Sequence, residues 1–384
     1  MRQIHQTLGV PRVINACGTF TPLGVSRSSE PVIEAVAESL RQFFVMDDLR
    51  RVFGEKVSEL TGAEWGSVTH CTAASITLSV AAVMTGSDLE KIRQLPDTKG
   101  MASVFVIQAG HMVDYGQAIE QAIRLSGGKV IVAGTPDCCS EHDLRSALGE
   151  DRVGGLVLVH SRLCKGQMVD AKTAIVIARE MGKPVILDAA AQDLIMDDVL
   201  SFGADLTLFS GQKYLASPTA GLVLGQCDLV DAVSLQESGI GRGMKAGKEA
   251  IVGAITALRM RSKMNLDAWA ADRASRTQKF AENISQLAPL TAELVPDPLG
   301  NPFSRVRITA DTQACGKTAL EIRERLATSD PIVIIQGHDD AENSIMLEVL
   351  ALNRQELEII TSLLAVIVFN RPPSGMRRRG IQDW

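Results

Sequence analysis

Short apolar runs alternate with longer amphipathic stretches over much of the chain from residue 103 onward. The apolar runs predict buried strands at residues 103–108, 129–133, 155–159, 184–188, 205–210 and 221–225. The amphipathic stretches predict helices over residues 114–126, 141–148 and 170–181, and an earlier one over 73–84. Parallel strands that are buried on both faces and joined by crossover helices produce this alternation. The pattern therefore predicts an α/β sandwich with a mostly parallel central sheet.

The pattern changes after the last of these strands. The elements expected there are helices over 245–261, 267–287 and 355–367 and strands over 305–309, 332–336 and 345–350. Such a mixture is typical of a small α+β domain. We therefore expect a large α/β domain over residues 46–263, a small C-terminal α+β domain over 264–384, and an N-terminal segment, 1–45, that packs with the small domain.

Two polar segments stand apart from the predicted elements. Residues 86–100 carry charges of both signs and predict a surface excursion. The tail, residues 371–384, combines two prolines and a glycine with a run of arginines. We expect that tail to be flexible or to contact another subunit.

Composition narrows the class of protein. Of 384 residues, 46% are hydrophobic and 22% are charged, which is the balance of a soluble globular protein. The formal net charge of -6 provides no broad positive field for nucleic acid or an anionic membrane. The sequence contains no run of 18 consecutive apolar residues, so we expect no membrane span. We expect a small-molecule substrate and neither a nucleic acid nor a membrane partner.

The 7 cysteines are odd in number and lack paired spacing, so they indicate reduced thiols and a cytoplasmic location. Cys138 and Cys139 lie near His142, but no second Cys/His pair completes a tetrahedral set. We expect no metal site.

A single lysine ends the segment Asp205-Leu-Thr-Leu-Phe-Ser-Gly-Gln-Lys213. Ligands of open α/β sheets bind at the carboxyl edge of the strands, and a partly desolvated lysine there can lose its proton and form an imine. Lys213 therefore fits a Schiff-base nucleophile, although a solvated lysine after a strand would give the same local sequence.

The strand Pro184-Val-Ile-Leu-Asp188 brings a carboxylate to the same edge. Pyridoxal phosphate needs a carboxylate against its ring nitrogen, because the protonated pyridine withdraws electrons from a carbanion at the substrate's Cα. Asp188 can supply that charge, and the small side chain of Ala190 leaves room for a flat ring. Capping of the next helix is the alternative use of Asp188.

A phosphate site is indicated where Val68-Thr-His-Cys-Thr-Ala-Ala-Ser75 enters the helix over 73–84. Free N–H groups at a helix start bind anions, so Cys71, Thr72 and Ala73 could hold the phosphate, with a hydroxyl from Ser210. Ordinary N-capping by Thr72 explains the same residues equally well.

The segment Gly239-Ile-Gly-Arg-Gly-Met-Lys-Ala-Gly-Lys248 is rich in glycine and basic residues but fits neither the P-loop nor the dinucleotide-binding pattern. We interpret it as an anion-binding loop that directs Arg242 and Lys245 at a phosphate or a substrate carboxylate. A solvated loop is the alternative.

His111 follows the strand over 103–108 and is the candidate for stacking on a cofactor ring or moving a proton. A buried structural histidine would also fit. His160 and Ser161 end the next strand and are weaker candidates for contacts with the cofactor.

Taken together, these segments resemble the fold-type I pyridoxal-phosphate enzymes and, more narrowly, the selenocysteine-synthase-like / D-glucosaminate-6-phosphate ammonia-lyase family. The resemblance runs from about residue 13 to residue 350. Its most specific motifs are Asp188-Ala-Ala-Ala-Gln192, Ser210-Gly-Gln-Lys213 and the glycine-rich segment 239–248. Asn15-Ala-Cys-Gly-Thr19 and Gly127-Gly-Lys129 add to it.

The resemblance implies that Lys213 carries the cofactor, that Asp188 pairs with its pyridine nitrogen, and that Thr72 and its neighbours bind its phosphate. It also implies a homodimer or larger assembly with active sites at subunit interfaces, and it places the glycine-rich loop near the cofactor phosphate.

The function that follows is a lyase that eliminates ammonia from a small hydroxy amino acid or amino sugar acid, with Lys213 as anchor and general base. The wider family also permits selenium transfer to seryl-tRNA, which the acidic chain disfavours. Racemase or aminotransferase chemistry uses the same carbanion. A catalytically silent protein on this fold is disfavoured by the presence of both Lys213 and Asp188.

Overall fold

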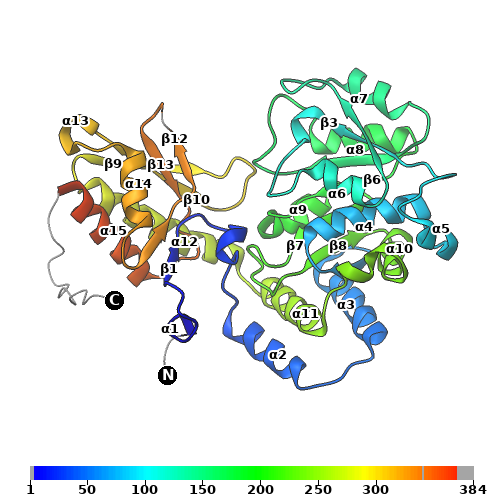
Figure 1. Cartoon of the computed structure of the whole chain (residues 1–384), viewed down its shortest axis with the longest axis horizontal. Coiled ribbons are helices and arrows are strands. Elements are labelled where there is room, and N and C mark those ends of the chain that lie inside the picture. The colour runs from blue at the N-terminus through cyan, green and yellow to red at the C-terminus, as the bar shows by residue number, and fades with distance from the viewer. Residues whose placement is uncertain (1–3, 340, 370–384) are drawn as a thin grey trace. The chain divides into compact units, whose positions relative to one another are not determined.

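The computed structural model describes residues 4–339 and 341–369, which form two compact units (Figure 1). The larger unit is Arg27–Met264, and the smaller one joins Met1–Ser26 to Asn265–Trp384.

The large unit is built on a seven-stranded sheet. Its strands, in spatial order, are β2 (Trp65–Thr69), β8 (Gly221–Gly225), β7 (Leu206–Ser210), β6 (Val185–Asp188), β5 (Val153–Val159), β3 (Val104–Gln108) and β4 (Lys129–Ala133). Only β8 runs antiparallel to its neighbours, so the other strands of this sheet share one direction. The predicted mostly parallel sheet is confirmed.

Helices cover both faces of this sheet (Figure 1). One face packs against α4 (Thr72–Thr85), α6 (Ile119–Leu125) and α10 (Cys227–Leu235), and the other against α3 (Met46–Thr61), α7 (Glu141–Leu148), α8 (Ala171–Glu180) and α11 (Lys248–Ser262). Along β3, Phe105 and Ile107 belong to the first core and Val106 to the second. Alternate residues of a strand point to opposite faces, which is why a strand covered on both faces is apolar throughout.

Shorter elements complete the large unit. They are α2 (Glu30–Leu40), α5 (Leu89–Gln94) and α9 (Met196–Leu200), with the 3-10 helices η2 (Ala109–His111), η3 (Asp193–Ile195), η4 (Gln236–Ser238) and η5 (Ile240–Met244). The predicted polar excursion, 86–100, contains α5, whose first turn is capped by the Asp88 carboxylate.

The small unit has its own core and its own sheets. An antiparallel sheet has the order β12 (Gly337–Asp339), β13 (Ser344–Leu347), β10 (Ser304–Ala310) and β9 (Leu290–Pro296), and β1 (Val13–Asn15) pairs in parallel with β11 (Ile332–Ile334). The helices are α1 (Ile4–Leu8), η1 (Thr21–Leu23), α12 (Leu266–Ser285), α13 (Thr312–Cys315), α14 (Ala319–Ala327) and α15 (Arg354–Phe369). Apolar side chains of α12, α14 and α15 pack against the strands, as expected for an α+β unit.

Three of the differences from the elements expected from the sequence lie in the large unit. Residues 27–45 lie with the large unit, because α2 packs on α11, whereas the prediction joined them to the small one. The helix expected over 114–126 begins only at Ile119, because Gly116 takes a left-handed φ of 100° and its N–H bonds to Asp114. The strand β2 was not predicted, since Trp65-Gly-Ser-Val-Thr69 is not an apolar run.

The predicted role of the tail, residues 371–384, falls outside the described residues. Within residues 4–339 and 341–369, no helix is both long and apolar enough to span a membrane.

Candidate active site

The sheet topology gathers the ends of several strands at one edge of the large unit. Because β2, β3, β5, β6 and β7 share a direction, their carboxyl ends lie along the same edge. Backbone hydrogen bonds join these ends: His160 N–H donates to Asp188 C=O (2.8 Å), and Ser210 N–H donates to Ala190 C=O (3.1 Å). This is the position at which open α/β sheets bind ligands.

Asp188 and Lys213 interact electrostatically at this edge. Asp188 ends β6 with only 7% of its surface exposed, and its Oδ1 accepts the N–H of Ala190 (3.0 Å). Burial raises the pKa of Asp188, and Lys213 and the Ala190 N–H only partly oppose that shift. Burial likewise lowers the pKa of Lys213, against the opposing effect of Asp188. A lowered pKa favours the neutral amine, which is the nucleophilic form.

A second buried carboxylate, Asp193, also acts on this lysine. Burial raises the pKa of Asp193 to about 6, with Arg261 and Lys213 among the groups that oppose the rise. Arg261 lies 3.6 Å from the Asp193 carboxylate and donates to the backbone carbonyls of Asp193 (2.9 Å) and Tyr214 (2.9 Å). Arg261 thereby joins the segment after β6 to the segment that carries Lys213.

The start of α4 lies beside the end of β7. Thr72 Oγ1 donates to Phe209 C=O (3.4 Å), one residue before the buried Ser210. No side chain caps the helix at its N-cap residue, Cys71. A Cβ on Gly221 would come within 2.5 Å of the Cys71 carbonyl, so only glycine permits this close approach. The first N–H groups of a helix have no partner within the helix, so those of the first turn, which includes Ala73, are available to an anion, and the phosphate site stays a prediction.

The glycine-rich loop contacts the segment before α4 through its backbone. His70 N–H donates to Met244 C=O (2.8 Å), and Thr69 forms an isolated antiparallel bridge with Lys245. Arg242 and Lys245 are exposed, and both lower the pKa of Glu237 against the opposing effect of its burial. The structure therefore puts this loop next to the α4 N-terminus.

His111 is 7% exposed and is held at the end of β3, where its Nδ1 accepts the N–H of Val159 (3.2 Å). Burial, with a smaller effect of His160, lowers the pKa of His111 to about 4. The imidazole is therefore neutral near pH 7. Stacking on a cofactor ring and proton transfer both stay predictions for His111.

Sequence reasoning missed two further residues at this edge. The hydroxyl of Tyr115 is buried and has no hydrogen-bond partner among the described residues, and Asp188 and Cys71 act on it electrostatically. Arg162, exposed in the loop after β5, is close enough to lower the pKa of Lys213. No motif marks either residue, and Tyr115 fell inside a predicted helix.

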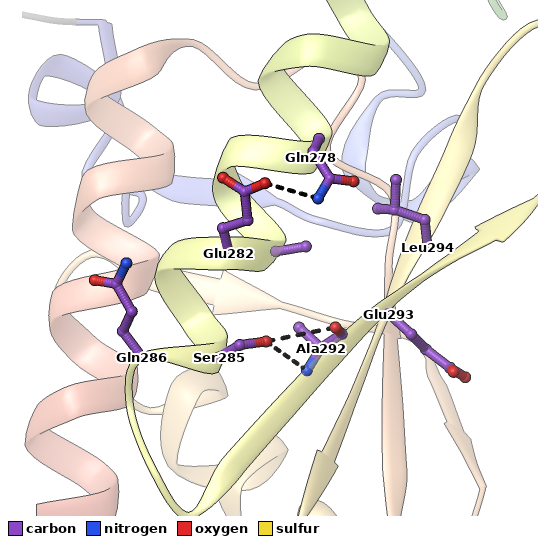
Figure 2. Close-up of a pocket in the computed structure, with 8 residues that line it drawn as sticks. Gln278, Glu282, Ser285, Gln286, Ala292, Glu293 and Leu294 are labelled. Atoms are coloured by element: carbon purple, nitrogen blue, oxygen red, sulfur yellow. Dashed lines mark hydrogen bonds between the residues drawn. The ribbon is translucent and has the colours of Figure 1, made fainter.

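A hollow of about 640 Å³ in the small unit contains none of the predicted site residues. It lies between α12 and β9, where Gln278 donates to Glu282 (2.8 Å) and Ser285 bonds to the backbone of Ala292 (Figure 2). The Glu293 carboxylate at this hollow is paired with Arg307 (2.9 Å). Among the described residues, no group of His, Cys, Asp and Glu is arranged to hold a metal ion.

Known proteins with similar sequences share this architecture. D-glucosaminate-6-phosphate ammonia lyase of Salmonella typhimurium (strain 14028s / SGSC 2262) is 33% identical over 95% of this chain and 97% of its own length. 5'-C-glycyluridine monooxygenase-decarboxylase of a Streptomyces species is 34% identical over 86% of this chain and 84% of its own. A solved D-glucosaminate-6-phosphate ammonia-lyase structure superposes with a TM-score of 0.87 at 32% identity, covering 96% of this chain and 99% of the other.

The fold is that of the fold-type I pyridoxal-phosphate-dependent transferases, as predicted. Residues 13–268 match the SelA family, described as L-seryl-tRNA selenium transferase. The chain belongs to this pyridoxal-phosphate-dependent family, which confirms the family resemblance found in the sequence.

Proposed function

We propose that this protein is a pyridoxal-phosphate-dependent lyase that releases ammonia from a hydroxy amino acid or amino sugar acid. The observation that carries the proposal is the pair formed by buried Asp188 and half-buried Lys213 at the carboxyl edge of the sheet, where each shifts the pKa of the other. The relation to an ammonia lyase over 95% of the chain supports the same reaction class.

The residues at the edge fit this cofactor. Lys213 would hold it covalently through Nζ, Asp188 would accept a hydrogen bond from its ring nitrogen, and the ring of His111 would cover it. The phosphate would meet the N–H groups of Cys71, Thr72 and Ala73. Additional donors are available from Ser210 and from the neighbouring loop that carries Arg242 and Lys245.

When bound, pyridoxal phosphate provides the electron sink that stabilises the electron pair left on the substrate's Cα. Asp188 would keep the ring nitrogen protonated, because its buried carboxylate lacks solvent to stabilise its charge and gains from a cationic partner. Lys213 Nζ, whose pKa is lowered by burial, would accept the proton from Cα. Loss of that proton and of the β-hydroxyl, followed by hydrolysis, converts a 2-amino-3-hydroxy acid into a 2-oxo acid and ammonia.

The acid group of the substrate is expected near Arg162. Its guanidinium lies at the same edge as Lys213, and among the described residues it forms no ion pair. An arginine binds a carboxylate or phosphate with two parallel hydrogen bonds. This favours an acidic substrate, such as an amino sugar acid or its phosphate ester.

Selenium transfer to seryl-tRNA is the alternative that the family description suggests. We place it second because the net charge of -6 opposes binding to a polyanion. A homodimer or larger assembly and a cytoplasmic location stay predictions.

The test is ammonia release from a panel of D- and L-2-amino-3-hydroxy acids and phosphorylated amino sugar acids, with the protein loaded with pyridoxal phosphate. We expect release from at least one acidic substrate. Asp188→Asn should retain the covalent cofactor but turn over about 100- to 1,000-fold more slowly, because one electrostatic contact to the developing charge is lost.

Two parallel measurements separate the competing reactions. Oxygen uptake with carbon dioxide release, without ammonia, would indicate the oxidative reaction named for the Streptomyces relative. A gel shift with seryl-tRNA at physiological salt, again without ammonia release, would favour the transferase. Either result would replace the lyase proposal.

A further inference from the structure

Tyr115 is the polar side chain at the site that the proposed chemistry does not use. It lies between η2 and α6 in a loop shaped by Gly116, and its own N–H donates to Gln117 C=O (3.2 Å). The phenol oxygen is buried, and it has no hydrogen-bond partner within residues 4–339 and 341–369. A buried hydroxyl without a partner costs free energy, so such groups are uncommon in folded proteins.

The groups that act electrostatically on the Tyr115 hydroxyl indicate which part of the site it lies in. The groups that act on it electrostatically include Asp188, the proposed partner of the ring nitrogen, and Cys71, the N-cap residue of the proposed phosphate site. Burial, with smaller effects of those two charges and of Asp114, raises the pKa of Tyr115. The phenol therefore keeps its proton at pH 7 and is a donor that lacks an acceptor.

We propose that the Tyr115 hydroxyl donates a hydrogen bond to the phosphate of bound pyridoxal phosphate. This inference rests on the proposed cofactor site. At the Cys71 end of that site the groups already identified are donors, namely the N–H groups of the α4 start. Tyr115 packs against the apolar core to which α4 contributes, so its hydroxyl would add one more donor to a phosphate held at the α4 start. A hydrogen bond to a charged acceptor is stronger than one between neutral groups.

Ser79 provides a matched control. Like that of Tyr115, its hydroxyl is buried without a partner among the described residues, and it lies on α4. Ser79 is two turns from the N-terminus of that helix. Ser79→Ala and Tyr115→Phe each remove one such hydroxyl, so only a difference in cofactor binding distinguishes the two positions.

The experiment measures binding of pyridoxal phosphate and of pyridoxal, which lacks the phosphate, to the cofactor-free full-length protein by absorbance titration. We expect Tyr115→Phe to weaken binding of pyridoxal phosphate about tenfold or more, the loss typical of a hydrogen bond to a charged group. Binding of pyridoxal should be unchanged, and Ser79→Ala should bind both like the parent. The thermal midpoint of cofactor-free Tyr115→Phe should equal or exceed that of the parent, because an unsatisfied donor is removed.

Three results would overturn the inference. If Tyr115→Phe weakens the binding of pyridoxal phosphate and of pyridoxal equally, the hydroxyl contacts the ring and not the phosphate. If binding of pyridoxal phosphate is unchanged, the hydroxyl does not contact the cofactor. If the thermal midpoint of the cofactor-free variant is lowered, the hydroxyl has a hydrogen-bond partner within the protein. Failure of the parent to bind pyridoxal phosphate would instead contradict the proposed function itself. Ammonia release enters none of these readouts.

Discussion

Buried charged side chains are stabilised by hydrogen bonds in the small unit, whereas burial dominates their pKa shifts at Asp188 and Lys213 in the large unit. In the small unit, Arg305 donates to Asp297 (2.9 Å) and to Glu348 (3.0 Å), and Asp297 also accepts from the side chain of Asn301 (3.1 Å). Burial raises the pKa of Asp297, but the hydrogen bonds from Asn301 and Arg305 outweigh it and the net shift is downward. In the large unit, the same competition ends with burial dominant at Asp188 and Lys213.

The difference separates a structural cluster from a site built to receive a ligand. Hydrogen bonds that satisfy every member make a buried ionic cluster rigid, and removal of one member leaves the others unpaired. Around Lys213 the charges are desolvated, and within residues 4–339 and 341–369 neither carboxylate oxygen of Asp193 has a hydrogen-bond partner, so this region has polar groups to offer to a bound ligand. The comparison predicts that changes at the Arg305 cluster alter stability and that changes at Asp188 and Lys213 alter chemistry.

The largest effect is expected from Lys213→Ala. Loss of both the covalent anchor and the general base should reduce turnover by about 10,000-fold, the upper end for proton-transfer groups. Borohydride reduction followed by peptide mass spectrometry should locate the cofactor on Lys213 in the parent. Lys183→Ala is the control, since Lys183 Nζ donates to Val153 C=O (2.8 Å) and has a structural contact only. Label on another lysine would refute the assignment.

Arg305→Met should have the next largest effect, on stability. It leaves Asp297 and Glu348 buried without their cation, so the free energy of unfolding should fall by about 3–5 kcal/mol. Arg307→Met removes a more exposed arginine from the same strand, whose partners are Glu293 (2.9 Å) and Glu342 (3.1 Å), and should cost less than about 1 kcal/mol. Urea unfolding followed by circular dichroism compares the two. Equal losses would mean that the buried cluster contributes no more than a surface pair.

The smallest expected effect is the contribution of His111 to the pH dependence of the free energy of unfolding. Its pKa is about 4 in the folded protein against an ordinary 6.5, so its contribution is complete above pH 6.5 and is lost as the pH falls toward 4. Relative to His111→Gln, which does not titrate, the parent should lose about 3 kcal/mol of unfolding free energy between pH 7 and pH 4.

That measurement needs the variant as a reference, because Asp193 acts in the opposite direction. Its pKa of about 6 is raised, so protonation of Asp193 favours the folded state as the pH falls. The contribution of Asp193 cancels in the difference between parent and His111→Gln. A difference that does not change with pH would show that His111 is not held neutral by burial.

Much of the large unit could be predicted from the sequence because most of its strands are continuous apolar runs. Titratable residues stand at or just after the ends of several of these runs. Lys213 and Asp188 were identified by that rule, and the structure does place them at one edge. Their chemical roles stay predictions. The family motifs added the phosphate loop, which local sequence alone left ambiguous between anion binding and ordinary capping.

The residues that were missed depend on features without a periodic signal. Tyr115 required knowledge that Gly116 and the Asx turn at Asp114 delay the start of α6. The contact between Asp193 and Arg261 joins positions 68 residues apart. Arg162 lies in a loop whose course is set by backbone bonds to neighbouring segments, such as that of Lys165 N–H to Gly110 C=O (3.0 Å).

The pairing of β2 with β8 has a consequence for the order in which the protein is made. β2 is the first strand of the large sheet along the chain, yet its hydrogen-bonding partner is the last, and Thr69 Oγ1 contacts Gly221 C=O across 152 residues. During synthesis β2 must wait, without its partner, until β8 has left the ribosome. The proposed phosphate site at Cys71 cannot close before then, since its geometry depends on Gly221. On that proposal, capture of the cofactor requires a nearly complete large unit, so a nascent or truncated chain that lacks β8 is expected to be free of cofactor.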